Sequence, residues 1–238
     1  MAKETYAARC TANVLITPRV HEARIELVDP PQFAFKAGQF ITVPVAEGVL
    51  RSYSIASAPE DPRWLKVAVD VQPGGPGSRF FASLQPGQEL KFQGPYGAFV
   101  VRDDAHPHLV FVGTGTGIAP LRSMILDLER RGQGHRRMTL FFGVRFADDL
   151  MYHDEFLALA AKHPDTFTYI PSLSRPEGSD WPGDVGRVTT VIPRLLPPEV
   201  AAAATAYLCG SKEMLKEVTE ILVGLGMDRK QVKKEQFW

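Results

Sequence analysis

The pattern of apolar residues changes once along this chain, around residue 104, and the change limits which folds are possible. Before it, short β-rich runs such as residues 23–28 and 40–45 lie between Pro and Gly residues. Many short strands separated by turns are typical of an antiparallel sandwich or barrel. After it, apolar strand-like runs such as residues 109–112 alternate with helical runs such as residues 118–131. Strands that alternate with helices predict a parallel sheet.

We therefore predict two domains, an antiparallel β-barrel at residues 1–104 and an α/β parallel-sheet (Rossmann-like) domain at residues 105–238. Apolar residues make up 45% of the 238 residues, which is enough for packed cores. One helix is expected in the first domain, over residues 79–84 with Ser78 as its N-cap. Lys plus Arg and Asp plus Glu number 27 each, so the charge balance gives no support to a nucleic-acid partner.

A glycine-rich segment stands between a predicted strand and a predicted helix in the second half. It reads Gly113-Thr114-Gly115-Thr116-Gly117 and continues with Ile118-Ala119-Pro120. Glycines let the backbone approach a pyrophosphate, and a helix N-terminus supplies unpaired N–H groups and a favourable dipole. Ile118 stands where the ordinary dinucleotide fingerprint has its third glycine, so the segment taken alone is also compatible with a purely structural turn.

The first half carries Arg51-Ser52-Tyr53-Ser54, whose side chains suit a flavin nucleotide. Arg51 offers a bidentate guanidinium for a phosphate, Tyr53 a flat ring for stacking, and Ser54 a small hydroxyl donor. In a strand, Arg51 and Tyr53 share one face and the two serines share the other. Without further context, the alternative interpretation is a surface strand with one cross-strand Arg–Tyr pair.

Taken together, these segments resemble those of the ferredoxin–NADP⁺ reductase family, and the resemblance covers nearly the whole chain. Three further strings are similar to family motifs: Gly74-Gly75-Pro76-Gly77-Ser78, Leu208-Cys209-Gly210-Ser211 and Glu235-Gln236-Phe237-Trp238. The resemblance implies an FAD-dependent NAD(P)H oxidoreductase that lacks an iron–sulfur domain. It implies that FAD is bound by Arg51, Ser52, Tyr53, Ser54, Gly75, Gly77, Ser78, Phe237 and Trp238. It implies that NADP(H) is bound by Gly113, Thr114, Gly115, Thr116, Gly117, Arg145, Ser174, Arg175, Arg187, Cys209 and Gly210.

The resemblance also implies roles within the site, with Ser54, Cys209 and Glu235 as the catalytic residues. Ser54 is expected to hydrogen-bond flavin N5, and Glu235 matches a family glutamate near the flavin hydrogen-bond network. Cys209 resembles a cysteine that packs beside the nicotinamide, and the sequence shows no obvious base that would make it a nucleophile. Phe237 matches the aromatic residue that stacks on the second flavin face, and Trp238 a residue that contacts the FAD adenine.

The choice between NADPH and NADH is expected to depend on arginines that follow the strands of the second domain. Arg145 follows one predicted strand, Ser174 and Arg175 follow the next, and Arg187 lies in a Gly-Arg-Val string. A carboxylate favours NAD because it accepts from the ribose 2′-OH, whereas an arginine suits the 2′-phosphate of NADP. These positions resemble the phosphate-binding cluster of bacterial NADP-type reductases. We therefore favour NADPH, with NADH as the alternative because similar strings occur in NADH-dependent relatives.

The sequence leaves the electron acceptor open. Our first hypothesis is a small acidic carrier, ferredoxin or flavodoxin; the second is an oxygenase component or free flavin; the third is a non-catalytic module that senses redox state. The basic stretch at residues 130–137 either solvates a turn or helps to dock an acidic carrier. No metal site is expected. Residues 1–6 lack the pattern of a secretion signal and no apolar run is long enough to span a membrane, so we expect a cytoplasmic protein. We also expect a monomer.

Overall fold

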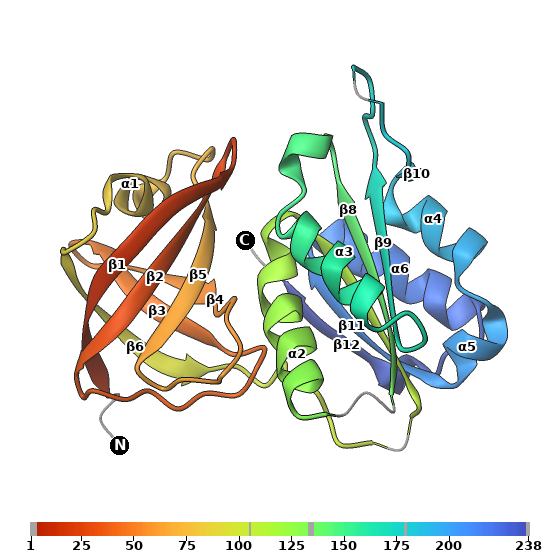
Figure 1. Ribbon diagram of the computed structural model, residues 1–238, viewed down its shortest axis with the longest axis horizontal. Helices are drawn as coiled ribbons and strands as arrows, with labels where there is room; N and C mark the ends of the chain where they lie inside the picture. The colour runs from red at the N-terminus through yellow and green to blue at the C-terminus, as the bar shows by residue number, and fades with distance from the viewer. Residues whose placement is uncertain (1–3, 105, 133–135, 179, 237–238) are drawn as a thin grey trace. The chain divides into compact units, whose positions relative to one another are not determined.

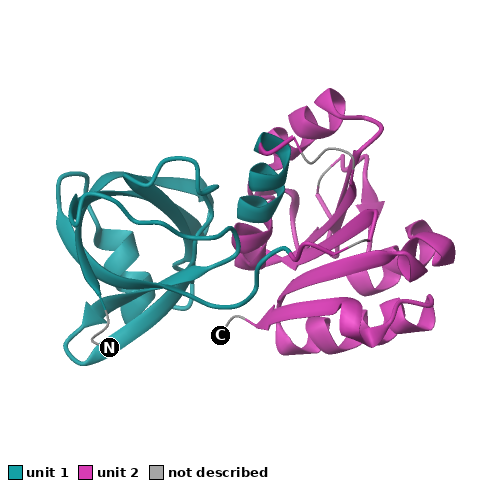
Figure 2. Ribbon diagram, turned by 90° about the horizontal axis from the view of Figure 1, so that it is seen from below, with its two compact units in different colours: residues 1–101, 122–130 teal, residues 102–121, 131–238 magenta. Residues whose placement is uncertain are grey.

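The computed structural model describes residues 4–104, 106–132, 136–178 and 180–236. The chain divides into two compact units, one formed by Met1–Val101 with Arg122–Arg130 and the other by Arg102–Leu121 with Arg131–Trp238 (Figure 2). The predicted fold class is confirmed: an antiparallel β unit is followed by a parallel α/β unit. Residues 122–130, which lie within one helix, group with the first unit. The predicted domain limits, at residues 104 and 105, stay a prediction.

The first unit is built on a six-stranded antiparallel sheet with strand order β4-β3-β6-β1-β2-β5 (Figure 1). A bridge between Ile55, just after β4, and Val67 on β5 joins the two edges, so the sheet closes as a barrel. Phe33, Phe81 and Phe92 are fully buried in its core. The elements are β1 (Thr5–Thr17), β2 (Val20–Asp29), β3 (Phe40–Ala46), β4 (Val49–Ser54), β5 (Trp64–Asp70), α1 (Pro76–Ser83) and β6 (Glu89–Tyr96).

The start of α1 differs from the prediction. The helix begins at Pro76 after Gly75, and Ser78 lies inside the first turn instead of capping it. Proline suits the first helical position because its fixed φ angle is already helical and it has no N–H to satisfy. The Ser78 hydroxyl instead donates to the Asp70 carbonyl, at 3.2 Å, and so ties the helix to the end of β5.

The second unit has a six-stranded, all-parallel sheet with strand order β10-β9-β8-β7-β11-β12 (Figure 1). Buried apolar side chains of α4 and α6 pack with β7 and β11 on one face. On the other face, Phe156 of α3 contacts Phe167 and Tyr169 of β9. The strands are β7 (His108–Thr114), β8 (Arg137–Val144), β9 (Phe167–Leu173), β10 (Asp184–Val185), β11 (Ala204–Gly210) and β12 (Val232–Gln236). The helices are α2 (Ile118–Arg130), α3 (His153–Lys162), α4 (Val188–Leu195), α5 (Pro198–Ala202) and α6 (Lys212–Gly224). Within the described ranges, no helix combines the length and the apolar character needed to cross a membrane.

Strand β12 is a feature that the sequence pattern did not predict. Its residues, Val-Lys-Lys-Glu-Gln, are mostly polar, so they lack the apolar alternation of a strand. The strand nevertheless pairs in parallel with the fully buried β11, with Cys209 opposite Glu235. The C-terminal segment is therefore part of the sheet up to Gln236.

Candidate functional site

Most residues expected to bind the nucleotide lie at one edge of the second sheet. In a parallel sheet the carboxyl ends of all strands meet at the same edge, and the loops there form the usual ligand crevice. Strand β7 ends at Thr114, β8 leads into Arg145, β9 leads into Ser174, and β11 ends at Gly210. The fold therefore gathers segments that are far apart in the sequence.

The glycine turn after β7 combines close packing with one open position. A 3₁₀ turn, Gly115–Gly117, links β7 directly to α2. A Cβ atom at Gly117 would lie 2.2 Å from the Cys209 carbonyl oxygen, and one at Gly113 would lie 3.1 Å from a Leu121 methyl group. Gly115 has φ +53° and nothing within 4 Å of a Cβ position. Its backbone is thus accessible beside a helix N-terminus, which fits a phosphate group.

The arginines expected to select the nucleotide belong to this edge. Arg145 and Arg175 are neighbours across β8 and β9, because the Arg175 amide donates to the Arg145 carbonyl at 2.9 Å. The Ser174 amide donates to the Val144 carbonyl in the same ladder, at 3.0 Å. Arg187 precedes α4, and the amide of the adjacent Gly186 donates to the Leu173 carbonyl at 2.8 Å. Arg145, Arg175 and Arg187 are all exposed.

Cys209 and Glu235 are brought together by the pairing of β11 with β12. Cys209 is 1% exposed. Burial, and then the negative charge of Glu235, raise the pKa of the Cys209 thiol. The thiol therefore stays protonated at neutral pH, which suits a packing group better than a nucleophile. That Cys209 packs beside the ligand stays a prediction.

In the first unit, β4 and α1 bring the two expected flavin segments together. A Cβ atom at Gly77 would lie 2.2 Å from the Tyr53 hydroxyl oxygen and 3.5 Å from Cγ of Arg51. Tyr53 also packs edge to face on Phe81 of α1, with ring centroids 4.7 Å apart. The first turn of α1 has unpaired backbone N–H groups, so a guanidinium, an aromatic ring and a helix N-terminus stand side by side.

The alternative of a cross-strand Arg–Tyr pair on β4 does not hold between β4 and β3. Arg51 lies opposite Val43, and Tyr53 lies opposite Ile41. Tyr53 is half-buried, and this burial raises its pKa to about 12, although the positive charge of Arg51 acts in the opposite direction. Tyr53 is therefore a neutral ring at physiological pH, with Arg51 close enough to influence it.

Ser52 and Ser54 alternate with Arg51 and Tyr53 along β4, and the Ser52 hydroxyl lies 3.4 Å from that of Thr42 on β3. Phe237 and Trp238 lie outside the described residues. The first unit offers a guanidinium and a helix N-terminus, and the second offers a glycine turn and arginines. Each of these sets of donors fits the phosphates of a dinucleotide.

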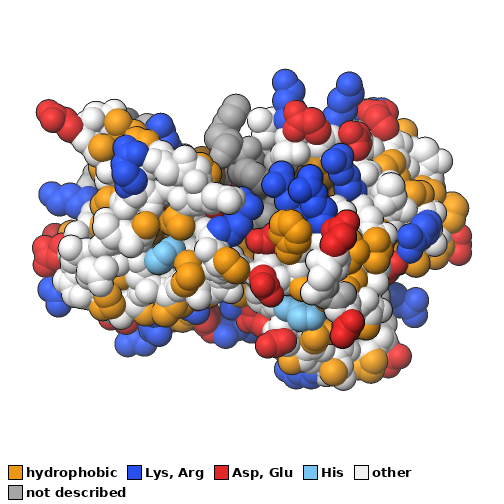
Figure 3. Space-filling model, turned by 90° about the horizontal axis from the view of Figure 1, so that it is seen from above, with side chains coloured by type: hydrophobic (Ala, Val, Ile, Leu, Met, Phe, Trp, Pro, Cys, Tyr) orange, Lys and Arg blue, Asp and Glu red, His pale blue; other side chains and the backbone are white. Residues whose placement is uncertain are grey.

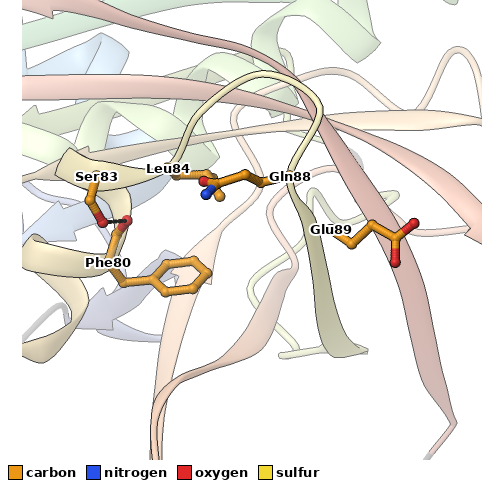
Figure 4. A pocket seen from close by; sticks show the side chains of 5 residues that line it. All are labelled: Phe80, Ser83, Leu84, Gln88 and Glu89. Carbon is orange, nitrogen blue, oxygen red and sulfur yellow. Dashed lines mark hydrogen bonds between the residues drawn. The ribbon is translucent and has the colours of Figure 1, made fainter.

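A pocket of about 400 Å³ lies elsewhere in the first unit, between α1 and the start of β6 (Figure 4). Its lining residues are Phe80, Ser83, Leu84, Gln88 and Glu89. In this pocket the Ser83 hydroxyl donates to the Phe80 carbonyl at 3.1 Å, so that hydroxyl is already used within α1. None of the expected flavin-binding residues lines it, and we assign it no part in the site.

The sequence-based prediction gave no role to two polar residues that the structure buries. Arg122 and Ser123, in α2, hydrogen-bond to the carbonyls of Ala56 and Ser57, directly after the flavin segment. The sequence signal available was a polar Arg-Ser pair between the apolar residues Leu121 and Met124. Local patterns do not show what such a pair contacts, because the partners lie 66 residues away.

Comparison with known proteins identifies the two units. Residues 8–101 match the oxidoreductase FAD-binding domain, and residues 111–220 match the oxidoreductase NAD-binding domain. The chain is 38% identical over 244 residues to a protein named ferredoxin–NADP reductase B from Sorangium cellulosum (strain So ce56), covering 98% of each chain. The chain belongs to the ferredoxin–NADP⁺ reductase family. It is therefore a flavoprotein oxidoreductase whose cofactors are FAD and NAD(P).

Other relatives in this family serve oxygenases by name. The chain is 31% identical over 239 residues to the reductase component DmpP of phenol 2-monooxygenase from Pseudomonas sp. (strain CF600), covering 99% of this chain and 66% of that protein. Among solved structures, the Amycolatopsis cytochrome P450 reductase GcoB superposes with a TM-score of 0.88 at 26% identity, covering 98% of this chain and 70% of GcoB. Members of the family are therefore named for more than one kind of electron acceptor.

Proposed function

We propose that this reductase takes hydride from NADPH in preference to NADH and passes electrons to a small carrier protein, ferredoxin or flavodoxin. The observation that carries the nucleotide preference is the set of exposed arginines, Arg145, Arg175 and Arg187, at the carboxyl edge of the second sheet. Guanidinium groups there suit a 2′-phosphate. The relative of nearly equal length, named ferredoxin–NADP reductase B, supports the same choice.

The described residues divide the work of binding and orientation. Arg51 and the N-terminus of α1 bind the FAD pyrophosphate, Tyr53 stacks on the flavin ring, and Ser54 places a hydroxyl near N5. Bound flavin supplies the hydride acceptor and converts a two-electron donor into a source for one-electron carriers.

The second unit holds the nucleotide through three features. The backbone at Gly115 and the N-terminus of α2 bind the NADPH pyrophosphate. Arg145 and Arg175 bind the 2′-phosphate. Cys209 stays protonated and packs against the nicotinamide. Glu235, opposite Cys209 on the neighbouring strand, places its carboxyl group next to it.

A kinetic comparison tests the nucleotide preference. We expect the wild-type kcat/KM to be higher for NADPH than for NADH. Arg145→Ala is expected to raise the KM for NADPH about tenfold or more, by removing a charge-assisted hydrogen bond, while the KM for NADH changes little. Arg137→Ala is the matched control, because Arg137 is an exposed arginine at the start of β8, whereas Arg145 directly follows the end of that strand. A higher kcat/KM for NADH, or an unchanged NADPH KM in Arg145→Ala, would exclude this assignment.

The second candidate is a reductase component of an oxygenase, supported by the likeness to DmpP and GcoB. On the face drawn in Figure 3, Lys and Arg side chains lie close to Asp and Glu side chains, so the charge on that face does not by itself favour an acidic carrier. Cytochrome c reduction with and without added ferredoxin, flavodoxin or oxygenase component separates the candidates. Stimulation by ferredoxin or flavodoxin supports the first candidate, and stimulation only by an oxygenase component supports the second.

A further inference from the structure

The part of helix α2 that belongs to the first unit carries two buried polar side chains, Arg122 and Ser123. The Arg122 guanidinium donates from Nη1 to the Ala56 carbonyl at 2.7 Å, and the Ser123 hydroxyl donates to the Ser57 carbonyl at 2.6 Å. Arg122 is 9% exposed and Ser123 is 0% exposed. Burying a guanidinium is costly unless it is well hydrogen-bonded. These residues are therefore placed to satisfy particular partners.

Their partners form the seam at which the barrel closes. The Ile55 amide still bonds to Gln39, beside β3, at 3.0 Å, whereas the next amide, that of Ala56, bonds to Lys66 on β5 at 2.8 Å. Ile55 also makes the bridge to Val67. The chain thus changes partner strand within two residues, immediately after Ser54. The carbonyls of Ala56 and Ser57 follow directly, and α2 supplies donors to both of them.

A third contact holds α2 beside the same seam. A Cβ atom at Gly38 would lie 2.4 Å from the Met124 methyl group, so Met124 packs directly on the turn that precedes Gln39. At the exposed end of the helix, Arg130 forms an ion pair with Glu60. Residues 122–130 accordingly group with the first unit although they follow the first strand and glycine turn of the second.

We propose that Arg122 and Ser123 are positioning residues for flavin binding. By holding the carbonyls of Ala56 and Ser57, they fix the end of β4 on which Tyr53 and Ser54 stand. This inference rests on the proposed function, because it assumes that Arg51 to Ser54 bind the flavin. It differs from a catalytic role, since neither side chain is expected to touch the cofactor.

The test measures flavin binding in the full-length protein. FAD is removed and the dissociation constant for added FAD is determined by flavin fluorescence, together with the visible absorption and circular dichroism of the bound flavin. Arg122→Met keeps most of the side-chain volume but removes the donors, and we expect the FAD dissociation constant to rise about tenfold. Ser123→Ala is expected to raise it about threefold. Arg130→Met, which breaks only the exposed ion pair on the same helix, is the control and should leave FAD binding unchanged.

The outcomes separate the positioning role from the flavin-site assignment. An altered visible spectrum and weaker FAD binding in Arg122→Met, partly restored in Arg122→Lys, support the proposal. Arg122→Met and Ser123→Ala proteins with wild-type FAD affinity and spectrum overturn it, even where their melting temperatures fall. Arg51→Ala is included in parallel: if it also retains FAD, the flavin segment itself is misplaced. Where Arg122→Met does not fold, Arg122→Lys and Ser123→Ala decide by the same criteria.

Discussion

The two glycine-rich turns of this chain, residues 113–117 and residues 74–78, differ in what their closely packed glycines contact. In the nucleotide turn, side chains at Gly113 and Gly117 would meet the core or the backbone of β11, and Gly115 faces open space. In the flavin turn, a side chain at Gly77 would meet the end of the Tyr53 side chain, and Gly75 faces open space. Each turn therefore contains an open glycine that exposes backbone and a packed glycine that sets the position of a neighbouring element.

The difference between the packed glycines concerns what they touch. Gly117 is close to main-chain atoms of a buried strand, which cannot move without disturbing the sheet. Gly77 is close to the hydroxyl end of one side chain, which can rotate away. The nucleotide turn therefore affects the stability of its unit. The flavin turn affects mainly the orientation of Tyr53, a residue expected to bind the cofactor.

The largest expected effect follows from Gly117→Ala. The added methyl group would lie 2.2 Å from the Cys209 carbonyl oxygen and 3.1 Å from the Gly210 amide nitrogen, so the turn or β11 must shift. We expect a loss of about 3 kcal/mol in the free energy of unfolding and weaker NADPH binding, measured by denaturant unfolding and by KM. Gly115→Ala is the matched control: it meets open space and is expected to cost only about 1 kcal/mol, from its positive φ. Equal losses in the two variants would show that the close contact of Gly117 with β11 does not limit stability.

Gly77→Ala is expected to have a smaller effect on stability and a clear effect on the cofactor. The methyl group displaces the Tyr53 side chain, so we expect a loss of about 1 kcal/mol in unfolding free energy. The dissociation constant for FAD is expected to rise about tenfold, measured by flavin fluorescence. Gly75→Ala, with an ordinary φ of −69° and nothing within 4 Å of its Cβ, should resemble the wild type. A Gly77→Ala protein that keeps wild-type FAD affinity would remove Tyr53 from the proposed flavin site.

The smallest effect concerns the titration of Tyr53 in the protein without FAD. Burial raises its pKa from 10.0 to about 12, so the folded protein retains a proton that the unfolded chain loses in this interval. The contribution is fully present below pH 10 and is lost as the pH rises to 12, which means that stability falls with pH there. In Tyr53→Phe, the fall in unfolding free energy between pH 10 and pH 12 should be shallower than in the wild type. Identical slopes would show that the phenol is not protected by the fold.

The sequence predicted those parts of the fold and site that depend on local signals. The strand, glycine turn and helix around Gly115 follow one another in the chain, and each has its own pattern. The gathering of Arg145 and Arg175 at one edge also followed, because a parallel sheet brings the carboxyl ends of its strands together. Strand β12 was missed because its polar residues carry no apolar alternation, and only pairing with β11 makes them a strand.

Ser78 shows a second limit of local reasoning. A serine before an apolar run usually indicates an N-cap, but Pro76 starts α1 earlier and the hydroxyl serves a carbonyl on β5 instead. The contacts of Arg122 and Ser123 were also beyond local patterns, since their carbonyl partners, on Ala56 and Ser57, are 66 residues away in the chain. In both cases a polar side chain is committed to a distant backbone group, and only the folded chain defines that partner.

In the function proposed here, this one chain accepts hydride from a nicotinamide nucleotide through a bound flavin. The most direct measurement is an anaerobic titration of the FAD-loaded protein with NADPH, followed by the visible absorbance of the flavin, with NADH in parallel. We predict bleaching at about one equivalent of NADPH, slower bleaching with NADH, and marked slowing of the NADPH reaction in Gly117→Ala. A flavin absorbance that remains unchanged with both nucleotides would show that the chain does not transfer hydride to its flavin.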